Sequence, residues 1–126
     1  MASLLKVNDL ENLDGGSPTL GGDEVAKVAD KNQCTAWVNF DGTDGTIRDS
    51  FNINNVDRND VGDYTISFEV EMDNSNYSLS GMAQNGEDTL SISGDLLTTD
   101  FTVNTRDSNG NSEDSSIVTV QVIGGK

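Results

Sequence analysis

Two carboxylates placed two residues apart, Glu69 and Glu71, are the residue types that glycoside hydrolysis uses. That reaction needs one buried acid with a raised pKa and one ionised partner, both facing one cleft. Apolar and polar residues alternate over 64–70, which places Glu69 on the water-facing side of a strand. We therefore expect a solvated acidic surface here and predict no catalytic residue.

The remaining residue types also argue against an enzyme. Histidine is absent, which removes the commonest general base, the Ser–His dyad and imidazole metal ligation. The single cysteine, Cys34, cannot build a thiolate zinc site or an intramolecular disulfide alone, and we expect a small buried hydrophobe there. We predict no cofactor and no metal.

Two acidic turns have the composition of calcium loops, at 41–45 and 107–114. The second begins Asp-x-Asn-x-Asn as an EF-hand loop does. It then has Ser112 where glycine is needed and Val118 where the bidentate glutamate belongs. Because Asp, Asn and Gly also dominate ordinary hairpin turns, we interpret both segments as turns.

The most informative aromatic residue is Trp37, which falls on the opposite side of its strand from Ala36, Val38 and Phe40. A buried or interfacial position is favoured, because tryptophan is highly buried on average and enriched at interfaces. The alternative is an exposed platform on which a sugar stacks, for which Tyr77 is the one plausible second aromatic residue.

The charge of the chain excludes two classes of partner. There are 22 acidic and seven basic residues among 126, with a net charge of -15, so a nucleic acid or an anionic membrane would be repelled. No signal peptide fits the first residues and no apolar run approaches membrane-spanning length. We expect the chain to be made and kept in the cytosol unless a larger assembly carries it.

The candidate residues discussed above lie in or between short segments that are rich in Val, Ile, Thr, Phe and Tyr and are separated by polar turns. We predict seven strands, at 35–40, 46–53, 64–70, 77–82, 89–93, 101–105 and 116–123, with a loop at 55–63 and one helical turn at Leu96 and Leu97. This pattern is typical of an all-β fold, an antiparallel β-sandwich or jelly-roll-like double sheet over residues 34–126.

Residues 1–33 differ from the rest and predict an extended N-terminal arm. Glycine pairs at 15–16 and 21–22 and the only proline, Pro18, interrupt any long element. The apolar residues are too sparse for an independent core, and we expect them, together with Trp37, to bind a partner; they are Leu4, Leu5, Val7, Leu10, Leu13 and Leu20.

The order of several segments resembles small structural proteins of tailed bacteriophages, notably those of cyanobacteria and other marine bacteria. The segments that carry this resemblance are AWVNFDGT at 36–43, IRDSFN at 47–52, GDYTISF at 62–68, MDNSNY at 72–77 and SIVTVQV at 116–122, with LKVN at 5–8. It covers about residues 34–125.

The resemblance implies a non-enzymatic β-domain on the virion surface, a homotrimer, and no catalytic residues. The chain has one arm and one domain, without a shaft or repeats, so a capsid decoration, cement or head-fibre protein is favoured over a tail fibre. The expected partners are other copies of the chain and the major capsid protein or another virion protein. A tail-fibre-type module that binds host-surface carbohydrate is the alternative.

Overall fold

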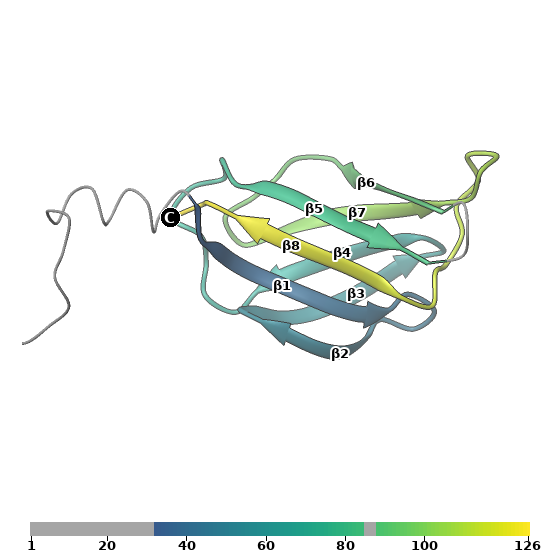
Figure 1. Cartoon of the computed structure of the whole chain (residues 1–126), viewed down its shortest axis with the longest axis horizontal. Helices are drawn as coiled ribbons and strands as arrows, with labels where there is room; N and C mark the ends of the chain where they lie inside the picture. The colour runs from purple at the N-terminus through teal and green to yellow at the C-terminus, as the bar shows by residue number, and fades with distance from the viewer. Residues whose placement is uncertain (1–31, 85–87) are drawn as a thin grey trace, which may run out of the picture.

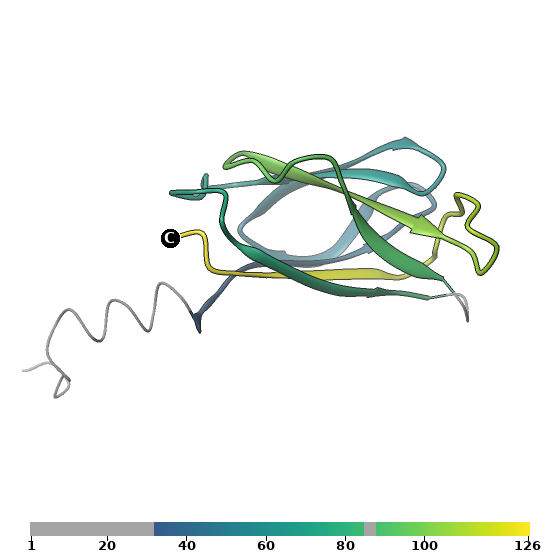
Figure 2. The same cartoon turned by 90° about the horizontal axis from the view of Figure 1, so that it is seen from above.

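The computed structural model describes residues 32–84 and 88–126, and these form two antiparallel four-stranded sheets packed face to face (Figures 1 and 2). The first sheet has the strand order β2-β1-β8-β5 and the second the order β3-β4-β7-β6. The predicted all-β sandwich is therefore confirmed. The strands are β1 (Cys34–Asp41), β2 (Thr46–Phe51), β3 (Ile53–Asp60), β4 (Asp63–Phe68), β5 (Ser78–Ala83), β6 (Thr89–Ser93), β7 (Asp100–Arg106) and β8 (Val118–Ile123).

Alternation along each central strand builds the core between the sheets. In β4, Tyr64 and Ile66 are fully buried and Phe68 nearly so, while the residues between them face outward. In β8, the three valines at 118, 120 and 122 do the same. Edge-to-face aromatic contacts join the layers, such as the one between the rings of Phe40 in β1 and Tyr64, 5.1 Å apart.

A fixed corner at Asn52 carries the chain from one sheet to the other. Its φ of 56° is left-handed, a conformation that asparagine tolerates better than most residues. Its side-chain amide donates to the carbonyls of Thr35 and Val70, and its side-chain oxygen accepts from the Val70 amide at 2.7 Å. The single strand predicted at 46–53 was therefore wrong, because the chain turns at Asn52 and begins β3 at Ile53.

The loop predicted at 55–63 was also wrong, because most of it belongs to β3. This edge strand pairs only with β4 and turns mainly Ile53 and Val56 toward the core. Its other side chains are polar and solvated, so no alternation of apolar residues marks it in the sequence.

Two smaller predictions fail where chain segments cross between or leave the sheets. The alternation expected over 64–70 would place Val70, like Tyr64, on the buried side of the strand, but β4 ends at Phe68 and Val70 is 61% exposed. The predicted helical turn at Leu96 and Leu97 is an irregular segment, in which the Leu97 amide donates to the Asp100 carbonyl. Over the described ranges, no helix is long and apolar enough to cross a membrane.

Candidate functional site

Residue Trp37 lies on the outer face of the β2-β1-β8-β5 sheet, where 36% of its surface is exposed. Its cross-strand neighbours are Phe51 on β2 and Gln121 on β8, and Gln121 in turn faces Ser80 on β5. The indole is therefore outside the core of its own chain. The side chains around the indole decide whether this position suits a second copy of the chain or a sugar.

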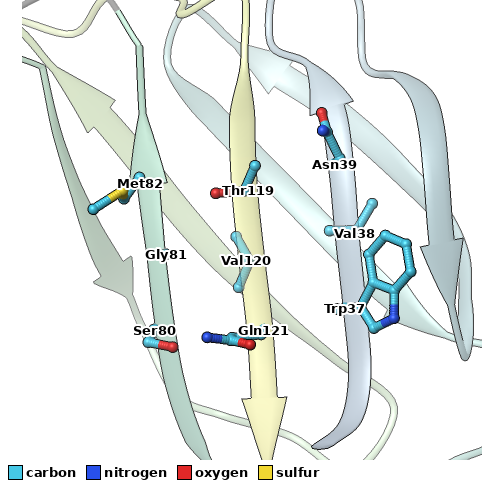
Figure 3. A pocket seen from close by; sticks show the side chains of 9 residues that line it. All are labelled: Trp37, Val38, Asn39, Ser80, Gly81, Met82, Thr119, Val120 and Gln121. Carbon is cyan, nitrogen blue, oxygen red and sulfur yellow. The ribbon is translucent and has the colours of Figure 1, made fainter.

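A shallow trough of about 500 Å³ crosses this outer face (Figure 3). We call it the outer trough, and its outward side chains are Trp37, Asn39, Ser80, Met82, Thr119 and Gln121. Strand β8 forms its middle, and β1 and β5 form its two sides. Met82 is 77% exposed. Among the described residues, no carboxylate or cationic side chain lines the trough, although the chain as a whole carries a charge of -15.

The side chain of Asn39 is held in place at the edge of this trough. The Arg48 guanidinium donates to its side-chain oxygen at 3.3 Å and to the carbonyl of Ser116 at 2.7 Å. Arg48 also lies 3.7 Å from the Asp41 carboxylate. Because a guanidinium only donates, the Asn39 oxygen faces Arg48 and its NH₂ group keeps its donors for another acceptor.

A second hollow, of about 460 Å³, lies at the end of the sandwich where β1 begins. We call it the end groove; among its lining residues are Gln33, Cys34, Phe51, Glu69, Val70 and Lys126. Phe51 is 54% exposed. Both Phe51 and Val70 flank the hydrogen-bonded corner at Asn52, so the shape of this apolar surface is fixed by the fold.

The other predicted partner-binding residues lie outside the described residues; they are Leu4, Leu5, Val7, Leu10, Leu13 and Leu20. The interpretation of Cys34 as buried needs correction, because it is half-buried beside the end groove, where its thiol donates to the Ala36 carbonyl at 3.4 Å. Tyr77 was named as a second sugar-stacking residue, and this was wrong. It is 95% buried, its hydroxyl donates to the Leu97 carbonyl, and burial raises its pKa to about 12.

The carboxylates singled out in the sequence lie on the surface or in turns. Glu69 and Glu71 follow the end of β4 and are exposed. Asp41 accepts from the amide and hydroxyl of Thr43, which holds the pKa of its carboxyl below the usual value. In the second acidic turn, Asp107 accepts two backbone N–H bonds. Across residues 32–84 and 88–126, no three acidic or cysteine side chains gather where they could hold a metal ion.

One carboxylate is the centre of a structural network at the far end of the sandwich from the end groove. Burial by itself would raise the pKa of Asp114, but hydrogen bonds from Arg58, Gly62 and Tyr64 outweigh it and lower the pKa. The Tyr64 hydroxyl also lies 2.8 Å from the Gly42 carbonyl, and burial raises the pKa of this phenol to about 12. The network ties three loops together, so its role is stability.

The sequence indicated Trp37 but none of the residues opposite it in the trough. Met82, Ser80, Thr119 and Gln121 come from strands whose neighbours in the sheet cannot be inferred from local alternation. No family model matches the chain, and no curated protein and no solved structure is significantly similar to it.

Proposed function

We propose that this protein is a non-enzymatic structural protein of a bacteriophage particle, a capsid decoration or cement protein held on the virion surface. Residues 1–33 and the end groove together form its attachment site. The observation that carries the proposal is the apolar surface of Phe51 and Val70 beside Gln33, where residues 1–33 join the sandwich. The resemblance of several segments to virion proteins supports the choice of particle.

The end groove has properties of a contact surface. Phe51 and Val70 expose large apolar areas, and covering such area on binding is favourable by roughly 25 cal/mol per Å². Because the hydrogen bonds of Asn52 hold the corner, little conformational entropy is lost when a partner covers it. Residues 1–33 are part of the same chain as this surface. A partner that binds them is therefore held near the end groove, which raises its effective concentration for the second contact.

Copies of the chain are proposed to form a homotrimer on the particle, with Phe51, the cross-strand neighbour of Trp37 on β2, near the contact. Three chains of charge -15 repel one another, and this repulsion is screened beyond about 8–10 Å at physiological ionic strength. Trimers should therefore strengthen as salt is added. Sedimentation of the full chain measures this, and a 13.4 kDa species at every salt concentration would contradict the trimer.

The attachment site is tested with particles of the phage that encodes the chain, grown without the gene and supplied with variants. A double variant, Phe51→Ser with Val70→Ser, should fold but be largely lost from purified particles. Val61→Ser is the matched control, because Val61 is 42% exposed in the β3–β4 turn at the opposite end. Equal incorporation of both variants would place attachment elsewhere, and cryo-electron microscopy showing the density on tails would reject a capsid protein.

A further inference from the structure

The outer trough combines an aromatic ring with unused hydrogen-bonding groups. Among the described residues, the side chains of Ser80, Thr119 and Gln121 have no hydrogen-bond partner within the protein, and all three line the trough. Figure 3 shows Ser80 and Gln121 side by side on β5 and β8, with Trp37 on β1. Hydroxyl and amide groups that already face solvent can exchange water for a ligand without breaking protein contacts.

The arrangement fits the two surfaces of a sugar ring. The C–H groups on one face of a pyranose carry partial positive charge and pack against the negative face of an indole. The hydroxyls of this ring and of a neighbouring sugar unit need donors and acceptors. Asn39 supplies an amide on β1, and Gln121, Thr119 and Ser80 supply an amide and two hydroxyls across β8 and β5. Because Arg48 fixes the Asn39 amide, part of this set is ordered before a ligand arrives.

The absence of charged side chains from the lining selects among ligands. A phosphate or an acidic saccharide would meet the field of a chain with charge -15, and the cation at the edge of the trough, Arg48, already donates to Asn39 and Ser116. A basic peptide would find no carboxylate there. A volume of about 500 Å³ lies within the range of small-ligand sites. These features together favour a neutral saccharide.

A second copy of the chain fits this surface less well than a saccharide does. A stable protein contact usually buries about 800 Å² on each partner around an apolar centre. The outward residues of the trough are four polar side chains and two apolar ones, Trp37 and Met82, which lie on different sides of it. The exposed apolar pair of the end groove is better suited to protein contact.

We propose that the outer trough is a binding site for a short neutral oligosaccharide, which stacks on Trp37 and hydrogen-bonds to Asn39 and Gln121. This goes beyond the attachment role, because it uses the broad face of the sheet and not the end at which residues 1–33 join. A virion protein with both features is held at one end and binds glycan through its side.

The chain offers an internal probe, because Trp37 is its only tryptophan. Full-length protein is titrated with laminarin, dextran and galactomannan as neutral probes and with polygalacturonate as an acidic one. A neutral probe should change the tryptophan emission saturably and retard the protein in affinity electrophoresis, whereas polygalacturonate should not. No saturable change with any of the three neutral glycans would overturn the proposal.

Variants separate a sugar site from a protein contact. Gln121→Ala should weaken retardation by the neutral glycan about tenfold, and Trp37→Ala should abolish it, with the circular dichroism spectrum unchanged. Ile92→Ala is the matched control, because Ile92 is a large apolar side chain, 51% exposed, on β6 of the other sheet and outside the trough. If Trp37→Ala left glycan binding intact but reduced the sedimenting mass, the surface would be a contact between copies. Since attachment is measured by incorporation into particles, either proposal can fail without the other.

Discussion

The two outer faces of the sandwich are built by the same alternation but differ in what they present. On the β3-β4-β7-β6 sheet, the outward positions of the paired strands are small or polar; they are Asn55, Asp57, Asp63, Thr65, Ser67, Ser91, Ser93, Asp100, Thr102 and Asn104. On the β2-β1-β8-β5 sheet, the corresponding positions include Trp37, Phe51, Met82 and Ile123.

The two faces therefore differ in their outward side chains and not in their architecture. Both sheets hold their inner faces against the same core. Several polar side chains on the β3-β4-β7-β6 face hydrogen-bond to one another. For example, the hydroxyls of Thr65 and Thr102 lie 3.1 Å apart, and the Asn104 side-chain amide donates to the Asp63 carboxylate. On the other face, the side chains of Ser80, Thr119 and Gln121 have no hydrogen-bond partner among the described residues.

The largest expected effect comes from Gly81, which lies in β5 behind the outer trough. A Cβ at this position would collide with the Thr119 carbonyl of β8 and crowd the Leu90 side chain, and both would have to move. We expect Gly81→Ala to lower the free energy of unfolding by about 3 kcal/mol, as overpacking does, and to weaken glycan binding by displacing β5.

Chemical denaturation measures this effect, with Ser91→Ala on the polar face as the control. Ser91 already has a Cβ and faces outward, and no glycine occurs in the four strands of its sheet. A loss below 1 kcal/mol for Gly81→Ala would show that β5 does not depend on close approach to β8.

An intermediate effect is expected at Asp114, where stability and binding should respond differently to pH. The lowered pKa of this carboxyl means that its stabilisation is present above its ordinary value of 3.8 and is lost as pH falls through the lower folded value. Asp114→Asn should cost about 2 kcal/mol at pH 7, because charge-assisted hydrogen bonds from Arg58, Gly62 and Tyr64 are weakened.

Urea denaturation of both proteins at several pH values measures the difference, which should shrink below pH 4. Glycan binding should stay constant between pH 5 and 9, since no side chain with a titration in that range lines the trough. Binding that followed a titration in this range would mean that a charged group takes part.

The smallest effect is expected on the polar face. Thr102→Val removes one of the two hydroxyls that lie together, but Thr65 keeps a bond from the Asn59 amide at 2.8 Å. We expect a change in unfolding free energy within about 0.5 kcal/mol and unaltered glycan retardation. A large loss of either would mean that the two faces are coupled through the core.

The sequence predicted a strand where apolar and polar residues alternate, which happens when one face of the strand is buried and the other is exposed to solvent. In β4, the spacing of Tyr64, Ile66 and Phe68 was sufficient to assign the strand and its buried side. It could not reveal β3, because an edge strand with two core-facing residues has almost no such pattern, and it could not show that Asn52 ends one strand and begins the next.

The candidate site was predictable only in part. Alternation placed Trp37 on the opposite side of β1 from the core, and the structure confirms this. Tyr77 has polar neighbours in the sequence, as an exposed aromatic residue would. Its ring nevertheless packs edge-to-face against the ring of Phe68, with the centroids 5.5 Å apart, and this contact is set by tertiary packing. The trough itself needs β5 beside β8, two strands about forty residues apart whose pairing no local signal encodes.

The turn that follows β7 forms a tip at one end of the sandwich. Asp107 holds it through bonds to the amides of Asn109 and Asn111, and a side chain at Gly110 would meet no atom within 4 Å. This turn lies at the opposite end of the sandwich from the start of β1, as Figure 1 shows. A foreign peptide inserted between Asn109 and Gly110 would therefore project from this tip, away from the end groove that is proposed for attachment.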